Sequence, residues 1–208
     1  MINKKIALIP AYEPQENLIG LISDLKKNDF NVIIVNDGSE KNIDIFNKLP
    51  SNIILLTHQK NQGKGAAIKT GLKYIKEHFN SPYFIVTMDC DGQHTVEDAI
   101  KLCDEVANNP KELVIGKRLI KSKTPIKSKI GNLLTRFIYK LITRVNVYDT
   151  QTGLRAFSDE LIDIFDNTKG NRYEYEINVL LKCASHNINI KEVEISTIYF
   201  NNNSRISL

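Results

Sequence analysis

Two carboxylates separated by one residue give the sequence its clearest chemical signal. Asp89 and Asp91 directly follow the apolar run FIVTM. Side chains at positions i and i+2 of an extended chain project in the same direction, so both carboxylates can hold one hard divalent cation. Such a cation keeps coordination sites free for phosphate oxygens, and the spacing therefore suits the joint binding of a metal and a diphosphate. A turn rich in Asp and Gly that caps the next helix is the alternative, and the strand-end position favours the metal site.

Two further polar segments follow apolar runs of strand length. Asn36-Asp37-Gly38-Ser39 comes after VIIV, where Asp37 could accept a hydrogen bond from a nucleobase or a ribose hydroxyl; an ordinary turn and helix cap is the alternative. The segment 62–70 contains the glycines and lysine of a phosphate loop, but Ile68 stands where the pattern G-x-x-x-x-G-K-[ST] requires glycine, which argues against a P-loop nucleotidase. This segment begins a helix that either lines a substrate pocket or packs closely through its small residues Ala66, Ala67 and Gly71.

The sequence lacks the residue patterns that characterise several classes of protein. The four histidines do not have the spacing of a zinc site, and the sequence contains no G-x-S-x-G string of a serine hydrolase. Three cysteines without a CxxC pair predict neither a disulfide framework nor a zinc ribbon, so we expect a reducing cytoplasm. No apolar stretch approaches the ~18 residues of a membrane helix, and the first residues do not resemble a signal peptide, so we expect a chain that neither spans a bilayer nor is exported.

Positive charge is concentrated in one segment of the chain. The formal net charge is only +4, but the segment from Lys117 to Arg144 holds nine basic residues and no acidic one. It is suited to anions, which could be substrate phosphates, nucleic acid or acidic lipid head groups; a solvated basic loop is the alternative. Its second half has the apolar spacing of an amphipathic helix, with Arg136, Lys140 and Arg144 on the opposite side. This helix could lie on an anionic membrane, but we expect it to pack on the core through Ile130, Leu133, Leu134, Phe137, Ile138, Leu141, Ile142 and Val145.

Alternating apolar runs and helical patterns must position these motifs. Of the 208 residues, 42% are hydrophobic and 25% are charged, which is typical of a soluble globular domain. The expected strands are 5–9, 31–35, 52–57, 83–88, 113–115, 154–157 and 188–197, and the expected helices are 17–27, 42–48, 65–78, 96–107 and 173–185. This order predicts a single α/β domain with a mostly parallel central sheet flanked by helices. Ligands bind beyond the carboxyl ends of parallel strands, so the loops 10–13, 36–39, 58–65 and 89–94 should meet at one edge of the sheet.

Eight motifs together resemble family 2 glycosyltransferases, which have the GT-A fold. In chain order the motifs are IALIPAYEPQENL, VIIVNDGS, NQGKGAAIKTGL, MDCDGQH, IGKRL, SKIGNLLTR, YDTQTGLRAFS and RYEYEINVLL, and the resemblance extends from Ile6 to Tyr199. Within that family the chain is similar to polyprenol-phosphate glycosyltransferases. These include dolichol-phosphate mannosyltransferases and bactoprenol glucosyltransferases, which are often joined to a GtrA-type membrane domain. The strings DGQH and DTQTGLR are far more specific than a DxD pair alone.

The resemblance implies a GT-A catalytic domain with a nucleotide-binding half, 1–116, and an acceptor-binding half, 117–208. The implied cofactor is Mg²⁺ or Mn²⁺, held by Asp89, Asp91 and Gln93. The implied nucleotide contacts are Pro10, Ala11, Tyr12, Glu13, Asp37, Gly38, Lys64, Asp89 and Cys90. The implied catalytic residues are Asp91, Gln93, Arg118 and Asp149, and contacts with the acceptor or its phosphate come from Lys129, Gln151, Thr152, Gly153 and Arg155.

The sequence departs from the family pattern in three places. The family's PxYNE start is here Pro10-Ala11-Tyr12-Glu13-Pro14, and its DDGS motif begins here with Asn36. The chain stops at Leu208, where related sequences continue into juxtamembrane helices and often membrane spans. We therefore expect either a missing C-terminal membrane segment or a membrane-domain partner.

The resemblance implies an inverting transfer of a hexose from a nucleotide sugar to a polyprenyl phosphate, by a protein peripheral to the anionic cytoplasmic face of a membrane. UDP-glucose is the preferred donor, and a UDP-N-acetylhexosamine or GDP-mannose is the alternative. A phosphate acceptor is already anionic near neutral pH and needs no general base. One rival is a transferase that acts on a saccharide hydroxyl, with Asp149 or Glu174 as the base. A second rival, a nucleic-acid-binding module in the basic segment, is disfavoured because that segment has only Phe137 and Tyr139 for stacking, so we expect no nucleic-acid partner.

Overall fold

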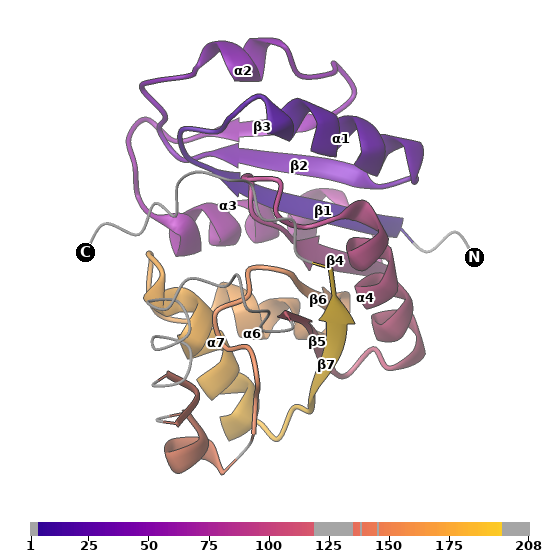
Figure 1. The fold of residues 1–208 in the computed structure, drawn as a ribbon, viewed down its shortest axis with the longest axis vertical. Helices are drawn as coiled ribbons and strands as arrows, with labels where there is room; N and C mark the ends of the chain where they lie inside the picture. The colour runs from indigo at the N-terminus through magenta and orange to yellow at the C-terminus, as the bar shows by residue number, and fades with distance from the viewer. Residues whose placement is uncertain (1–3, 119–134, 138, 145, 197–208) are drawn as a thin grey trace.

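One sheet of seven strands runs through the part of the chain that the computed structural model describes, which is 4–118, 135–137, 139–144 and 146–196 (Figure 1). The strand order is β3-β2-β1-β4-β6-β5-β7. All neighbouring strands are parallel except at β6, which is antiparallel to both β4 and β5. The expected mostly parallel sheet is therefore confirmed. The strands are β1 (Lys4–Ala11), β2 (Asn31–Asn36), β3 (Ile54–Thr57), β4 (Tyr83–Thr87), β5 (Leu113–Arg118), β6 (Arg155–Ser158) and β7 (Ile190–Ile195).

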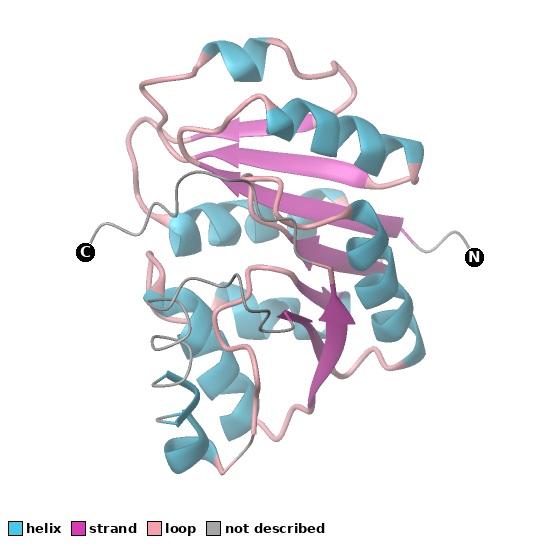
Figure 2. Cartoon of the chain, in the orientation of Figure 1, coloured by secondary structure: helices cyan, strands magenta, loops and turns pink. Residues whose placement is uncertain are grey.

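Helices cover both faces of this sheet (Figure 2). Side chains alternate along β1, so Ala7 and Ile9 join one apolar cluster with α1 and α4, while Leu8 joins a second cluster with α3, α6 and α7. Burial on both faces explains why the strands are almost continuously apolar in sequence. The helices are α1 (Asn17–Lys27), α2 (Asp44–Asn47), α3 (Lys64–His78), α4 (Val96–Asn108), α6 (Ile162–Asp166) and α7 (Glu174–Ser185), with a 3₁₀ turn, η1 (Asp159–Leu161).

Most expected elements are present, with differences at their ends. The helix expected at 42–48 is the single turn α2, and the strand expected at 52–57 begins at Ile54. The largest difference is β5, which was expected to end at Ile115 and instead continues to Arg118. The reason is tertiary: Gly116, Lys117 and Arg118 pair with β7, and no local apolar pattern signals that pairing. The extension places Arg118 at the carboxyl end of a strand.

The amphipathic helix packs on the core as expected, but the described residues of its expected apolar face are not the ones that make the contact. Residues 135–137 and 139–143 are helical, but Phe137, Leu141 and Ile142 are exposed. The helix is attached instead through Tyr139, which is buried and donates a hydrogen bond from its hydroxyl to the Leu180 carbonyl oxygen of α7, at 3.1 Å. The other residues of the expected apolar face lie outside the described residues: Ile130, Leu133, Leu134, Ile138 and Val145. Of the helices in the described ranges, none has the length and apolar character needed to cross a membrane.

Candidate functional site

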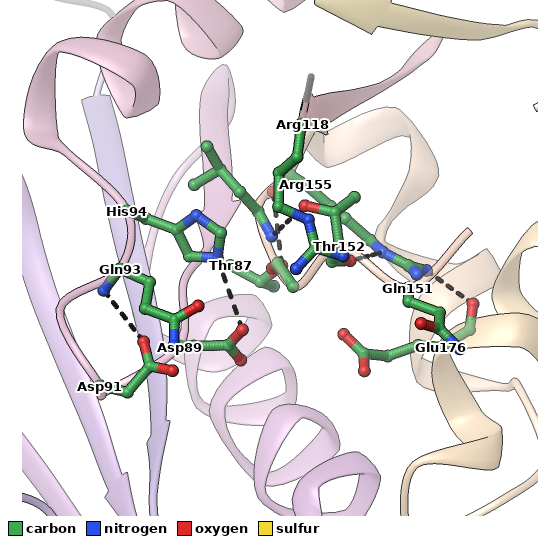
Figure 3. Close-up of polar contacts among 12 residues, drawn as sticks. Thr87, Asp89, Asp91, Gln93, His94, Arg118, Gln151, Thr152, Arg155 and Glu176 are labelled. Carbon is green, nitrogen blue, oxygen red and sulfur yellow. Dashed lines mark hydrogen bonds and ion pairs between the residues drawn. The ribbon is translucent and has the colours of Figure 1, made fainter. Parts of the chain in front are cut away.

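Asp89 lies just beyond β4 at the centre of a charged cluster. Its Oδ1 is 2.6 Å from Nζ of Lys64, the first residue of α3, and its Oδ2 is 3.4 Å from Nε2 of His94. Lys64 Nζ also lies 2.9 Å from Oε1 of Glu176 in α7. In the close-up the carboxylates of Asp89 and Glu176 point toward one another from different elements (Figure 3). Residues far apart in sequence thus form one site at the carboxyl edge of the sheet.

The cluster is charged at neutral pH. Burial would raise the pKa of Asp89, but the positive charge of Lys64 and the hydrogen bond from His94 outweigh it and hold that pKa far below the ordinary 3.8. Burial would lower the pKa of Lys64, but Asp89 and Glu176 hold it well above 10.5. Asp89 keeps 32% of its side-chain surface exposed, so its carboxylate is accessible to a ligand as well as paired.

Asp91 is the second carboxylate of the pair and is exposed to solvent. Its Oδ1 accepts the Gln93 N–H at 3.0 Å, and its carbonyl oxygen accepts a hydrogen bond from the Asn17 side chain at the start of α1. Although the residue as a whole is exposed, nearby protein atoms remove part of the hydration of its carboxyl group, and this desolvation, followed by the negative charge of Asp89, raises the pKa of Asp91. The two carboxylates therefore repel one another, and a divalent cation between them would remove that repulsion.

The donor atoms at this position fit Mg²⁺ or Mn²⁺, which prefer oxygen ligands. The described ranges contain no group of three or more His, Cys, Asp and Glu side chains arranged to hold a metal. Asp89 and Asp91 would supply two protein ligands, and the diphosphate would supply others. Gly153 lies directly against Asp89, because a Cβ at that position would overlap the Asp89 carboxylate. In Figure 3 the Gln93 side chain extends toward the two carboxylates, as a third ligand would.

Arg118 and Asp149 form a bidentate ion pair beside this cluster. Arg118 Nε lies 2.6 Å from Asp149 Oδ2, and Arg118 NH2 lies 3.0 Å from Oδ1. Asp149 is only 2% exposed, and its Oδ1 also accepts the Gln151 N–H at 3.2 Å. A carboxylate committed in this way orients the guanidinium of Arg118 and is poorly placed to take a proton from a substrate.

The expected phosphate contact by Arg155 does not fit the structure. Arg155 is 2% exposed, and its guanidinium donates hydrogen bonds to the main-chain carbonyl oxygens of Thr152 at 3.0 Å, Thr150 at 3.3 Å and Glu176 at 2.6 Å. It therefore fixes the loop before β6 against α7. Among the other expected acceptor contacts, Gln151 is exposed, whereas Lys129 lies outside the described residues.

The Asp37 side chain, like that of Arg155, is buried and engaged in hydrogen bonds within the protein. It is 3% exposed, and its two carboxylate oxygens accept the Gln62 and Gly63 N–H groups at 2.9 and 2.8 Å. His58 Nδ1 lies 2.7 Å from Asp37 Oδ1, and the other ring nitrogen lies 2.9 Å from Thr70 Oγ1 on α3. With both oxygens engaged, the expected direct contact of Asp37 with a nucleotide does not fit. Asp37 instead fixes the loop that presents Lys64.

The remaining expected nucleotide residues belong to loops that meet at this edge. Glu13 Oε1 accepts the N–H groups of Glu40 and Lys41, both at 2.9 Å, so the loop after β1 is tied to the loop after β2. Tyr12, in the same loop, is 49% exposed, and Pro10 and Ala11 are the buried end of β1. These contacts and the Lys64–Asp89 pair bring together all four loops that were expected to meet. Gly38 has the left-handed φ of 69° that its turn requires.

Cys90, between the two carboxylates, is a thiol rather than a thiolate. Burial, with the negative charge of Asp89 as a further cause, raises its pKa to about 11. It is therefore neither a nucleophile nor an anionic ligand at neutral pH.

Glu176 is the residue that sequence reasoning missed. The string RYEYEINVLL contributes to the resemblance, but no role was expected for its second glutamate. Lys64 and Glu176 are separated by 112 positions in the chain, so only their tertiary contact identifies the pair. Glu174, the base suggested for the rival transferase, accepts the N–H groups of Asn171 and Arg172 at 3.0 and 3.2 Å. The hydrogen bond from its own backbone N–H, followed by those from Arg172 and Asn171, lowers the pKa of Glu174, which makes it a weaker base.

Comparisons with known proteins agree with this architecture. UDP-N-acetylglucosamine–dolichyl-phosphate N-acetylglucosaminyltransferase of Methanococcus voltae is 34% identical over 222 residues, covering 96% of this chain and 88% of that protein. Polyprenol monophosphomannose synthase of Mycolicibacterium smegmatis is 24% identical, and the match covers 93% of this chain and 77% of the length of that protein. A solved structure of glucosyl-3-phosphoglycerate synthase from Mycobacterium tuberculosis, in complex with Mn²⁺ and UDP-glucose, matches 98% of this chain and 73% of that chain with a TM-score of 0.72 at 16% identity.

The structural similarity confirms the GT-A fold, and the names of the relatives support the expected polyprenol-phosphate branch. Residues 6–165 match the model of the family described as Glycosyl transferase family 2. Because this match covers well over half of the sequence, the chain belongs to glycosyl transferase family 2 and is a glycosyltransferase.

Proposed function

We propose that this glycosyltransferase moves a hexose, with inversion, from a UDP-sugar to the phosphate of a polyprenyl carrier at the cytoplasmic face of an anionic membrane. The transfer chemistry in this proposal is supported by one observation: Lys64 forms ion pairs with both Asp89 and Glu176, next to Asp91. The acceptor class is supported by the relatives named for dolichyl and polyprenyl phosphates.

The reaction requires stabilisation of the leaving diphosphate. An oxygen of the acceptor phosphate forms a bond to the anomeric carbon, and the bond from that carbon to the diphosphate breaks, its electron pair leaving with UDP. Mg²⁺ or Mn²⁺ bound by Asp89 and Asp91 would supply positive charge at the diphosphate. From its own side chains the protein contributes Lys64, at the N-terminus of α3, and Arg118, oriented by Asp149. Fixed charges of this kind favour the transition state without reorganisation.

The placement of the carboxylates supports a phosphate acceptor over a saccharide hydroxyl. A hydroxyl needs a base, and the two candidates, Asp149 and Glu174, are committed to Arg118 and to backbone N–H groups. A phosphate monoester is anionic near neutral pH and needs no base. The engaged carboxylates are therefore compatible with the proposed acceptor.

For the donor we propose UDP-glucose, as the sequence predicts, and we name UDP-N-acetylglucosamine as the second candidate. The Methanococcus voltae relative, which is named for UDP-N-acetylglucosamine, favours the second candidate.

The test is a matrix of nucleotide sugars and acceptors. The full chain is incubated with UDP-glucose, UDP-N-acetylglucosamine or GDP-mannose, with undecaprenyl or dolichyl phosphate, and with Mg²⁺ or Mn²⁺, and lipid-linked sugar is measured. We expect product with a UDP-sugar, none after chelation, and a loss of at least about 100-fold in kcat/KM for Asp91→Asn. Asp104→Asn, an exposed carboxylate on α4, is the matched control and should leave the rate unchanged. Transfer to a soluble saccharide with no lipid product would refute the proposed acceptor.

A further inference from the structure

Glu192 lies on β7, the edge strand that pairs with β5, outside the charged cluster around Lys64. Its side chain reaches the loop that precedes β6. There Glu192 Oε1 accepts the N–H groups of two consecutive residues, Tyr148 at 2.8 Å and Asp149 at 3.0 Å. One carboxylate oxygen therefore holds the main chain of the residue whose side chain orients Arg118.

These contacts form a continuous link from β7 to the guanidinium group of Arg118. Glu192 holds the Asp149 N–H, and the Asp149 carboxylate accepts Arg118 Nε at 2.6 Å and NH2 at 3.0 Å. Asp149 is buried, so the direction of its carboxylate depends on how its loop is held. In the pairing of β5 with β7, Glu192 is opposite Ile115 and Arg118 is opposite Ile195. The two ends of the link thus belong to neighbouring strands of one sheet.

Two further contacts keep the same loop beside the end of β5. The Tyr148 ring lies between two cations, with Lys117 Nζ 4.9 Å and the Arg136 guanidinium carbon 4.7 Å from the ring centre. Val147 is buried in the apolar cluster that also contains Tyr139. These side-chain contacts hold the loop in place, whereas the hydrogen bonds to Glu192 fix the peptide planes on either side of Tyr148. The direction in which the Asp149 side chain leaves the backbone follows from those planes.

We propose that Glu192 is a positioning residue for the transfer reaction: its two hydrogen bonds set the direction from which Asp149 presents both carboxylate oxygens to Arg118. This rests on the proposed function in one respect, namely that Arg118 stabilises the leaving diphosphate. A displacement of about 1 Å in such a group can lower a rate by about 100-fold. Glu192 acts through Asp149 rather than by contact with the substrate.

Two substitutions separate the hydrogen bonds of Glu192 from its negative charge. Glu192→Gln keeps an oxygen that can accept both N–H groups, so kcat/KM should stay within about threefold of that of the unchanged chain. Glu192→Ala has no acceptor and should lower kcat/KM by about tenfold or more. An equal loss in both variants would assign the effect to the charge and refute the proposal. If thermal unfolding shows that the alanine variant is unfolded at the assay temperature, Glu192→Met, which keeps the length of the side chain without its oxygens, takes its place.

Glu194→Ala is the matched control, because Glu194 is the next glutamate on the same strand and projects to the same side. The Glu194 side chain is 64% exposed, and its ion pair with Lys117 is long, at 3.5 Å, so the pair contributes little. We expect the kcat/KM of this variant to match that of the unchanged chain. A loss as large as that in Glu192→Ala would indicate a general disturbance of β7 and would contradict a specific role for Glu192.

A double-mutant cycle with Asp149→Gln shows whether Glu192 acts through Asp149. In the Asp149→Gln background the link to Arg118 is already broken, so adding Glu192→Ala should lower kcat/KM by less than about threefold. A purely structural role would lower it by the same factor in both backgrounds, and that result would overturn the proposal. Hydrogen exchange gives a readout without turnover. The Tyr148 and Asp149 amides should exchange about tenfold faster or more in Glu192→Ala, and at the unchanged rate in Glu192→Gln.

Nucleotide binding separates this proposal from the proposed function. If no nucleotide sugar is transferred to a polyprenyl phosphate, the proposed function fails, and the affinity for UDP in the presence of Mn²⁺ judges Glu192 instead. Glu192→Ala should then weaken UDP binding as much as Asp149→Gln does, and the double variant should weaken it no further. If lipid-linked sugar forms equally fast with Glu192→Ala and with the unchanged chain, the function stands and the positioning role is wrong. Unchanged exchange of the two amides in Glu192→Ala, or an unchanged affinity for UDP, would also show that it is wrong.

Discussion

At the scale of single residues, the site depends on Lys64, which is shared by two carboxylates. Asp89 and Glu176 lie 2.6 and 2.9 Å from its Nζ, and the side chains of Lys64 and Glu176 are only 16% and 12% exposed. A partly buried cluster of this kind is stable only while its charges balance, because each uncompensated charge retains its desolvation cost. Under the proposed function, a metal held by Asp89 would leave Lys64 to contact a donor phosphate with the same Nζ.

We expect Lys64→Gln to lower the free energy of unfolding by about 2 kcal/mol at neutral pH, because two carboxylates lose their common cation. The pKa of folded Asp89 is depressed, so its ion pair stabilises the fold above about pH 5 and loses this effect as the pH falls toward the folded pKa. The pKa of folded Lys64 is raised, so its contribution is complete below 10.5 and is lost as the pH rises through the folded value. Urea unfolding should therefore show the largest difference between about pH 5 and pH 9 and a smaller one near pH 3.

Lys73→Gln is the control for this measurement, because Lys73 is an exposed lysine on the same helix. Its free energy of unfolding should change by less than about 0.5 kcal/mol at every pH. A Lys64→Gln difference of constant size from neutral to acid pH would mean that the ion pair with Asp89 is not its cause.

Gly153 tests how closely the loop before β6 must approach Asp89. We expect Gly153→Ala to reduce kcat/KM by about tenfold or more, because the new methyl group would displace the Asp89 carboxylate from its position. Gly20→Ala in α1 is the matched control: a Cβ there meets nothing within 4 Å, so activity should be retained and stability should rise by up to about 1 kcal/mol. Full activity of Gly153→Ala would show that the position of Asp89 is not critical.

At the scale of elements, the loop after β2 holds the loop before α3 in place through hydrogen bonds. Asp37 holds the N–H groups of Gln62 and Gly63, and Gly63 adopts a left-handed φ of 105° directly before Lys64. A nucleotide contact was expected for Asp37 because its motif follows a buried strand. The strand-end position was predictable, but the direction of the carboxylate was not, since it depends on a loop 25 residues further along the chain.

We expect Asp37→Asn to lower the free energy of unfolding by about 1–3 kcal/mol, because an amide cannot accept both N–H groups and leaves one buried donor unpaired. Turnover should fall as well, since Lys64 loses its fixed loop. Thermal unfolding and donor kinetics check both effects, with Asp44→Asn, an exposed acid in the first turn of α2, as the control. A large rise in the KM for the donor with unchanged stability would instead support a direct nucleotide contact.

Local patterns predicted most elements and failed where the environment decides. The bounds of α1 were predicted without error, because the apolar spacing and the final lysines are local signals. The amphipathic helix shows the limit of the method: periodicity identifies an apolar side, but not what covers it. Among the described residues of that helix Tyr139 is the buried one, and its hydrogen-bond partner Leu180 is 41 residues away.

At the scale of the whole molecule, the reversed strand β6 completes the site. It lies between β4 and β5, and its first residue, Arg155, is in register with Thr87 of β4 and Ile115 of β5. Because β6 is antiparallel, the loop before it reaches the same edge at which β4 and β5 end. Gly153 thus lies against Asp89, and Asp149 reaches Arg118. The sequence predicted a strand at 154–157, but the reversal depends on pairing with β4, about 70 residues earlier, and with β5, about 40 residues earlier.

The arrangement of the whole site predicts how the rate depends on pH. If the acceptor is a phosphate monoester and no protein base takes part, the rate at saturating donor should rise as the phosphate loses its second proton, near about pH 6, and then stay level. The kinetic pKa then belongs to the acceptor, so a phosphonate analogue with a higher second pKa should shift the profile to higher pH by the same amount. Asp149→Gln should lower the rate through the loss of Arg118 orientation without moving that pKa. A kinetic pKa that ignores the acceptor but shifts in a carboxylate variant would establish a protein base and favour transfer to a hydroxyl.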